Sequence, residues 1–123
     1  MSISVTKSPA AFDAVVLAAG HNRNLDCATA LLGIGRETLL GRLARQLRSA
    51  GARRVIVVIG HQAEEIRRRH RDLIFVENPD YASTRTARSL ALGLAATRAA
   101  RVLVVDGDLV LEDGILPALL TVI

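Results

Sequence analysis

The chain has 123 residues and a mass of 13.2 kDa, a length that suits one domain and leaves little room for a second hydrophobic core. Half of the residues are hydrophobic, 23% are charged and the mean hydropathy is +0.32, which together exclude an intrinsically disordered chain. No uncharged apolar stretch reaches ~18 residues, so no membrane-spanning helix is expected. Cys27 is the single cysteine, so no internal disulfide can form and a cytoplasmic location is expected.

The chain is basic, with a net charge of +4 and a pI of about 10.5, and 15 of its 16 basic residues are arginine. Proteins that bind single-stranded nucleic acid usually stack bases on several aromatic rings. This chain has only three such residues, Phe12, Phe75 and Tyr81. The densest basic run, residues 67–71, is typical of a solvated helix end, where cations suit the helix dipole. A nucleic-acid partner is therefore not expected.

The first half of the chain predicts a tail, a strand, a loop and a helix. Residues 1–12 have no hydrophobic period and predict a flexible tail, so the folded domain is expected to span residues 13–123. Residues 14–19 are a continuous apolar run that ends at Gly20, which is typical of a strand buried on both faces. Residues 21–35 predict a loop. The next helix should end at Gly51. One face of this helix should point inward (Leu39, Leu40, Leu43, Leu47), and the arginines should face away from the core (Arg42, Arg45, Arg48).

The second half repeats the alternation of strand and helix. Residues 55–59 predict a second strand, residues 62–69 a short charged helix and residues 73–76 a third strand. After a turn at residues 78–81, Ser83 or Thr84 can cap a helix that runs to about Arg98. Its apolar positions should face inward: Ala87, Leu90, Ala91, Leu94 and Ala95. Residues 102–105 predict a fourth strand, and a last apolar helix begins near Asp113.

Strands that alternate with helices indicate an α/β fold with a parallel sheet and helices on both faces. With right-handed crossovers, the expected order of the four predicted strands is 3-2-1-4. In this order the chain adds strands 2 and 3 on one side of strand 1 and strand 4 on the other side, so the direction of winding reverses between strands 1 and 4. Ligands of open α/β sheets bind at such a point, outside the carboxyl ends of the strands. Two segments should meet there, residues 20–25 after the first strand and residues 106–108 after the fourth.

Each of these two segments has a chemistry of its own. The loop after the first strand could cradle phosphate with its backbone N–H groups, although Gly20 is its only glycine, and an ordinary turn is the alternative. Asp106 and Asp108 could hold one Mg²⁺, which prefers carboxylate oxygens, and in an extended chain both would point to the same side. The alternative is a plain Asp-Gly-Asp turn. Neither the dinucleotide-binding fingerprint nor a Walker A motif is present.

Four segments, in the same order along the chain, resemble the nucleotidyltransferases that make nucleoside-diphosphate sugars, cholines or cofactors. They are the opening strand and loop AVVLAAG (residues 14–20), LLGIGRETLL (residues 31–40), the stretch from NPDY to Ser89 and Leu90 (residues 78–90), and VVDGD (residues 104–108). The third segment is similar to the corresponding segment of phosphocholine cytidylyltransferases and related cytidylyltransferases. The resemblance spans residues 13–120 and implies a Rossmann-like, three-layer fold of the nucleotide-diphospho-sugar transferase kind, truncated to the nucleotide-binding half.

The resemblance also implies a reaction and its site. A phosphorylated small molecule would attack the α-phosphorus of a nucleoside triphosphate, with CTP favoured, and pyrophosphate would leave. It implies catalytic roles for Arg23 and Asp108, and a Mg²⁺ held by Asp108 with Asp106 assisting. The residues that it implies for nucleotide binding are Leu17, Ala18, Ala19, Gly20, His21, Asn22, Thr84 and Ser89.

The loop departs from the family pattern L-A-A-G-x-G-x-R followed by Pro-Lys. Asn22 and Asn24 stand where the second glycine and the arginine belong, and Ala28 and Thr29 stand at the Pro-Lys positions. Arg23, one position early, could replace part of the lost charge, but nothing replaces the lysine. Activity is therefore expected to be weak or lost, and a non-catalytic nucleotide-binding or interaction module is the alternative.

The fourth strand is expected to form an open edge of the sheet. Its residues are Val- and Leu-rich, and the segment from residue 115 to residue 123 carries no charge. Unpaired backbone groups at a strand edge favour association with another strand. The sequence therefore predicts self-association through the fourth strand and the terminal segment, or that the chain is a fragment of a longer protein.

Overall fold

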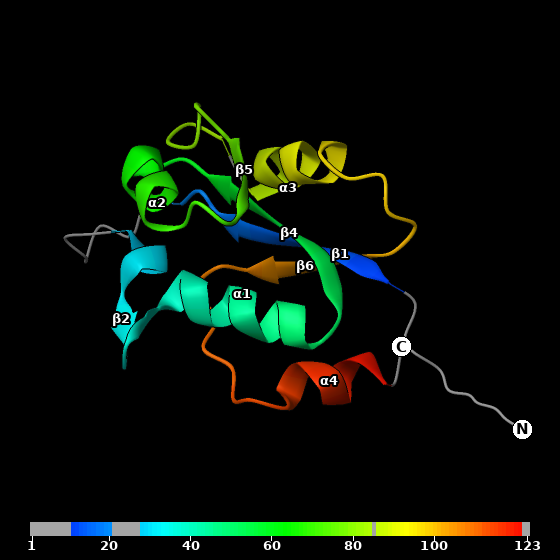
Figure 1. Ribbon diagram of the computed structural model, residues 1–123. Coiled ribbons are helices and arrows are strands. Elements are labelled where there is room, and N and C mark those ends of the chain that lie inside the picture. Colours follow the sequence, from blue (N-terminus) through cyan, green and yellow to red (C-terminus); the bar gives the residue numbers. More distant parts are fainter. Residues whose placement is uncertain (1–10, 21–27, 85, 122–123) are drawn as a thin grey trace, which may run out of the picture.

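A single parallel sheet forms the centre of the molecule (Figure 1). The computed structural model describes residues 11–20, 28–84 and 86–121. The sheet has four strands in the order β5-β4-β1-β6, with β1 at Phe12–Ala18, β4 at Ala52–Ile59, β5 at Ile74–Glu77 and β6 at Val102–Asp106. All three pairings are parallel. The predicted order 3-2-1-4 is confirmed, and β1 lies between β4 and β6 as expected.

Helices cover both faces of the sheet, which gives the predicted three layers (Figure 1). One face carries the larger core, to which α1 (Leu39–Ser49), α2 (Ala63–Arg69) and α4 (Ile115–Leu120) all contribute buried side chains. The other face carries α3 (Thr86–Ala95), which packs mainly on β1 and β4. In β1 and β4, adjacent residues belong to opposite cores, so these strands are buried on both sides. This explains why their sequences read as unbroken apolar runs.

Helix α1 follows the predicted pattern on its buried face. Its four leucines are at most 3% exposed, and the Thr38 hydroxyl caps the helix by accepting a hydrogen bond from the Gly41 N–H at 2.9 Å. Gly51, with φ of 114°, ends the helix in a conformation that favours glycine. The prediction that Arg42 faces away is wrong, because Arg42 is half-buried and its guanidinium donates to the Leu111 carbonyl at 2.9 Å.

The predicted loop 21–35 contains regular structure in its described part. A short 3₁₀ helix, η1, covers Thr29–Leu31, and a hairpin of β2 (Gly33–Ile34) and β3 (Glu37–Thr38) precedes α1. Gly35, with φ of 61°, lies in the hairpin turn. Residues 1–10 of the predicted tail lie outside the described residues, and β1 begins at Phe12, whose side chain is buried.

The inward face of α3 differs from the prediction. Four of the five apolar residues expected to face inward are exposed, namely Ala87, Ala91, Leu94 and Ala95. The residues that face the sheet are small instead: Ser89 and Gly93 are buried. A Cβ at Gly93 would lie 2.5 Å from Val15 Cγ1, so the helix approaches the sheet more closely than any larger residue would allow. Close packing against valines, and not hydrophobicity, therefore sets the rotation of α3.

The chain after β6 turns back to the α1 face. Gly107 and Asp108 form a turn, and α4 then buries Leu116 in the larger core. Ile115 and Leu119 on the same helix remain 47% and 46% exposed. Across residues 11–20, 28–84 and 86–121, no helix has the length and apolar character needed to cross a bilayer.

Candidate functional site

The carboxyl ends of β1 and β6 lie side by side, as predicted for the ligand crevice. Leu17 is in register with Asp106, and the Gly107 N–H donates to the Leu17 carbonyl at 2.8 Å. The predicted nucleotide-binding residues at the end of β1 (Leu17, Ala18, Ala19, Gly20) are thus brought next to the predicted metal-binding residues Asp106 and Asp108.

Gly107 allows this close approach. A Cβ at this position would lie 2.9 Å from the Leu17 carbonyl oxygen and 3.0 Å from Ala18 Cβ, closer than a side chain can stand without moving one strand end. Glycine is therefore needed between the two aspartates for a packing reason. The sequence pattern indicated a turn but not this contact.

The two aspartates are not related by the simple alternation of a strand. Val105 belongs to the core on the α1 side of the sheet, so the next residue, Asp106, faces the α3 side. On that side β6 is only partly covered, since Val104 is 40% exposed. The strand ends at Asp106, and Asp108 follows in the turn. The chain does not stay extended, so the expectation that both point to one side for that reason does not hold.

The donor chemistry of this pair fits a hard divalent cation. Both carboxylates are exposed, and neither is hydrogen-bonded or ion-paired to another described residue. Mg²⁺ is typically held by one or two protein carboxylates, with water and phosphate oxygens completing its shell. Within the described residues no group of three or more His, Cys, Asp or Glu gathers to hold a metal. Asp106 and Asp108 would thus bind the ion with help from water and a phosphate ligand.

The loop between Gly20 and Ala28 is described only at its two flanks. The predicted residues His21, Asn22 and Arg23 lie outside the described residues. At the far flank, the Ala28 N–H donates to Gln62 Oε1 at 2.8 Å. Gln62 itself has a φ of 55°, an uncommon left-handed conformation for a side-chain-bearing residue, at the start of α2. Gln62 thus fixes the chain at Ala28, a contact that the sequence analysis missed.

Thr84 and Ser89 are brought together by Asn78, a second residue that the sequence analysis missed. Asn78 is 1% exposed, and its Nδ2 donates to Thr84 Oγ1 at 3.0 Å and to Ser89 Oγ at 3.1 Å. Its Oδ1 accepts from the Asp80 N–H at 3.1 Å. The side-chain amide of Asn78 therefore fixes the turn and the start of α3. The Asn-Pro-Asp sequence predicted a turn but did not indicate that a buried Asn78 side chain makes these hydrogen bonds.

The predicted site residues form two groups. The Asn78 N–H donates to the Ile59 carbonyl at 2.7 Å, which places Thr84 and Ser89 beyond the end of β4. Asp106 ends β6 and Asp108 follows in the turn, and β6 lies on the other side of β1. Between the groups, the His61 N–H donates to the Ala19 carbonyl at 3.2 Å. A nucleotide that reached both groups would have to cross the ends of β1 and β4.

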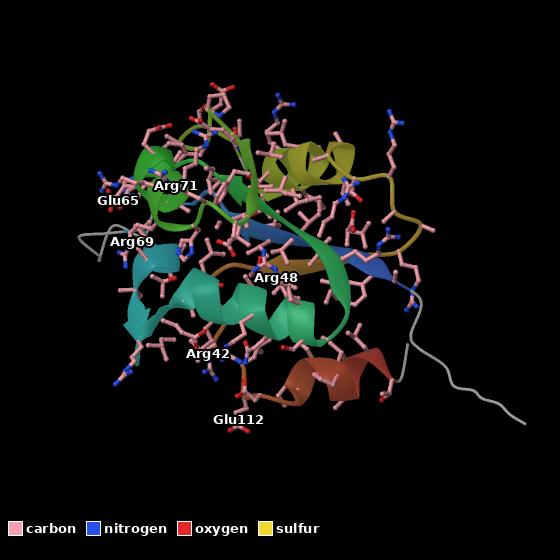
Figure 2. The ribbon with its side chains drawn as sticks, viewed as in Figure 1. Arg42, Arg48, Glu65, Arg69, Arg71 and Glu112 are labelled. Atoms are coloured by element: carbon pink, nitrogen blue, oxygen red, sulfur yellow. The ribbon has the colours of Figure 1, made fainter. Side chains whose placement is uncertain are left out.

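A cavity of about 670 Å³ lies at the carboxyl end of β4 beside α2. Three carboxylates and one guanidinium line it (Glu64, Glu65, Glu77 and Arg69), and neither Asp106 nor Asp108 does. Figure 2 shows Glu65 and Arg69, both of which belong to α2. All three glutamates are already paired with Arg67 or Arg68, whereas Asp106 and Asp108 pair with no other described residue, so the two aspartates are the better candidate site for a metal-bound triphosphate.

Comparison with solved structures supports the fold and its extent. A nucleotidyl transferase from Methanothermobacter (Mth528) is 27% identical with a TM-score of 0.74, and the match covers 89% of this chain and 54% of that one. The CTP:phosphocholine cytidylyltransferase LicC of Streptococcus pneumoniae is 22% identical with a TM-score of 0.72, covering 84% and 48%. The protein Rv0371c of Mycobacterium tuberculosis is 26% identical with a TM-score of 0.71, covering 90% and 59%; its manganese complex matches with a TM-score of 0.66.

The chain spans about half the length of these solved proteins. Among curated protein sequences none matches it significantly. A family model, in contrast, matches nearly all of the folded part, from residue 14 to residue 123, and describes a MobA-like NTP transferase domain. The predicted resemblance to nucleotidyltransferases is confirmed, and the chain belongs to the MobA-like NTP transferase family.

Proposed function

We propose that the chain binds a nucleoside triphosphate and Mg²⁺ at the joined ends of β1 and β6 and acts as the nucleotide-binding half of a nucleotidyltransferase. The observation that carries the proposal is the register of Leu17 with Asp106, held by the Gly107–Leu17 hydrogen bond of 2.8 Å. It sets two carboxylates that pair with no other described residue beside the carboxyl end of β1, where a phosphate chain would lie. Such a triphosphate substrate and the single cysteine both fit a cytoplasmic protein.

In the proposed reaction a phosphate oxygen of a phosphorylated small molecule attacks the α-phosphorus. The bond from the α-phosphorus to the bridging oxygen of the β-phosphate breaks, and pyrophosphate leaves with that oxygen. Asp108 and Asp106 would hold the ion, which neutralises phosphate charge when bound. The manganese complex of the mycobacterial relative supports a divalent metal. CTP is the favoured nucleotide because residues 78–90 resemble the corresponding segment of cytidylyltransferases.

A non-catalytic nucleotide-binding or interaction module is the second candidate. The observation that favours it lies at the positions where the family has Pro-Lys. Ala28 and Thr29 stand there, and their uncharged side chains supply no cation to the phosphates. The Ala28 N–H is bound to Gln62 instead. Arg23 is the remaining candidate for that role. Losing one such donor typically costs about 100-fold to 1,000-fold in rate, so turnover should be slow even where binding survives.

Two measurements on the same protein test the function and separate the candidates. We expect CTP with Mg²⁺ to raise the melting temperature more than UTP, GTP or ATP, and chelation of the metal to abolish the shift. Pyrophosphate release is then followed with phosphorylated acceptors such as phosphocholine. Slow, metal-dependent release supports the transferase, and binding without release supports the module. If no nucleotide binds with or without metal, the transferase and the nucleotide-binding module are both wrong, and only an interaction module is left.

We also propose that the open edge of β6 associates with a second copy of this chain. β6 is the last strand of the sheet, and Val104 on it is 40% exposed. On the other face of the sheet, Leu119 of α4 is also exposed, at 46%. Unpaired strand N–H and C=O groups beside exposed apolar side chains favour edge-to-edge pairing. A further part of a longer protein covering this edge is the alternative.

Light scattering coupled to size-exclusion chromatography tests this association. We expect a concentration-dependent dimer in the micromolar range, and Val104→Lys should shift it to the monomer because the edge would gain a charge. The control is Ile74→Lys on β5, at the opposite edge of the sheet, where Ile74 is similarly exposed at 44%. That variant should dimerise like the parent. A monomer at all concentrations would contradict the proposal.

A further inference from the structure

The segment that carries Asp108 is attached to the molecule at two points. At one end the Gly107 N–H is bound to the Leu17 carbonyl at 2.8 Å. At the other end the Leu111 carbonyl accepts two hydrogen bonds from α1, from Gln46 Nε2 at 2.8 Å and from Arg42 Nη2 at 2.9 Å. Asp108 lies between these two attachments. We infer that Gln46 and Arg42 are positioning residues for the Asp108 carboxylate, an inference that rests on the proposed metal-binding function.

The side chains between the attachments cannot fix the segment by packing. Leu109 is 40% exposed and Val110 is 63% exposed, and Asp108 is exposed as well. Leu111, only partly buried, is the first residue after the turn that packs against the larger core. A stretch of three exposed residues has several conformations open to it unless its ends are held. The hydrogen bonds at Gly107 and Leu111 are therefore what limits where Asp108 can lie.

Gln46 uses both N–H groups of its side-chain amide to bind this segment. It is 7% exposed, which is unusual for glutamine, and its Nε2 donates to Asp113 Oδ1 at 3.0 Å as well as to Leu111. This hydrogen bond, with the Arg45 charge nearby, also keeps the pKa of the Asp113 carboxyl below its usual value. A buried amide that lost these acceptors would be left unsatisfied at a substantial cost. Both hydrogens of the Gln46 amide are thus used to hold residues 111 and 113.

Arg42 supports the same carbonyl from one helical turn earlier. Figure 2 shows Arg42 on the side of α1 toward the connection between β6 and α4. Its Nε is buried without a partner among the described residues, so the Leu111 carbonyl is the acceptor that orients the guanidinium there. Because four buried leucines fix α1 in the core, both donors come from a rigid support. Metal ligands need such support to stay within about 0.5 Å of their productive position.

The test uses Gln46→Met, which keeps the length of the side chain and removes both donors, and Mn²⁺ as the probe. Binding is followed by electron paramagnetic resonance of free Mn²⁺, and the mobility of residues 108–111 by hydrogen–deuterium exchange. We expect the Mn²⁺ dissociation constant to rise about tenfold, the low end of what losing an outer-shell partner of a metal site costs. Exchange at residues 108–111 should accelerate, while exchange in β1 and β4 stays slow. Arg42→Lys keeps one donor and should weaken Mn²⁺ binding less than Arg42→Met.

The matched control is Arg48→Gln on the same helix. Arg48 is exposed and pairs with Asp72. It lies on a different face of α1 from Arg42 and Gln46 and makes no hydrogen bond to the Leu111 carbonyl. It should change neither Mn²⁺ binding nor exchange at residues 108–111. If Gln46→Met does not fold, Mn²⁺ binding and hydrogen–deuterium exchange are measured on Arg42→Met instead, because Arg42 is only half-buried.

The outcomes separate this inference from the proposed function. If the parent protein does not bind Mn²⁺, the metal assignment is wrong, and exchange alone decides whether α1 holds the segment. If the parent binds Mn²⁺ and Gln46→Met binds it equally tightly, the positioning role is overturned. Unchanged exchange at residues 108–111 in the folded Gln46→Met variant would overturn it as well.

Discussion

Replacing Asp108 with asparagine should remove metal-dependent nucleotide binding while leaving the fold intact. The change takes one full negative charge from the two carboxylates that we assign to the ion. We expect nucleotide affinity in Mg²⁺ to fall, and any nucleotidyl transfer to slow by about 100-fold to 1,000-fold, the range of rate loss seen when one key electrostatic group is removed. Asp108 is exposed and bonded to no other described residue, so the free energy of unfolding should change by less than about 0.5 kcal/mol.

Calorimetric titration of CTP with and without Mg²⁺ measures this effect. Asp106→Asn should weaken binding less, because we assign Asp106 the assisting role. The matched control is Glu112→Gln, which removes an exposed carboxylate four residues beyond Asp108 and should leave binding unchanged. An Asp108→Asn variant that binds CTP with Mg²⁺ as tightly as the parent would show that the metal assignment is wrong.

The sheet could be predicted because its strands are buried on both faces. Residues 14–19 and 55–59 are unbroken apolar runs, and only a strand sandwiched between two helical layers needs such a sequence. Once four strands and their crossovers were assigned, chain topology alone brought the end of β1 next to the end of β6. The juxtaposition of Leu17 with Asp106 is a consequence of topology, which is why it could be expected without any contact information.

Contacts between distant polar residues could not be predicted in this way. The bond from Gln46 to the Leu111 carbonyl joins residues 65 positions apart and leaves no local pattern. Asn78 looked like an ordinary turn residue, although its amide holds Thr84 and Ser89 together. The hairpin of β2 and β3 has strands of two residues each, too short for any period to be visible. In each case the structure depends on hydrogen bonds that composition and periodicity do not encode.

The rotation of α3 could not be predicted either, because hydrophobicity was the wrong guide. Counting apolar residues favours a face with Leu90, Leu94 and three alanines, yet the buried residues of the helix are Ser89 and Gly93. A small residue in a helix lets the whole helix approach the sheet, which buries more surface than one large side chain would. The backbone of α3 at Gly93 therefore packs almost directly on Val15 and Val58 of the sheet.

Gly93→Ala should consequently destabilise the protein although alanine is the better helix former. The new Cβ would lie 2.5 Å from Val15 Cγ1 and 3.0 Å from Val58 Cγ2. Both valines are fully buried and stiff at χ1, so α3 must move away from the sheet. Overpacking of this kind costs about 1–3 kcal/mol, and here we expect the upper end of that range. The gain in helix propensity offsets about 1 kcal/mol, which leaves a net loss of about 2 kcal/mol in the free energy of unfolding.

Urea unfolding of the parent and the variant measures this loss, and an unchanged slope would show that the same surface is exposed on unfolding. Gly33→Ala is the matched control, because a Cβ at Gly33 meets no atom within 4 Å and should change the stability by less than about 0.5 kcal/mol. A Gly93→Ala variant as stable as the parent would mean that α3 can shift without loss of packing. The close contact would then not be what sets the rotation of α3, and the position of Ser89 beside Asn78 would need another cause.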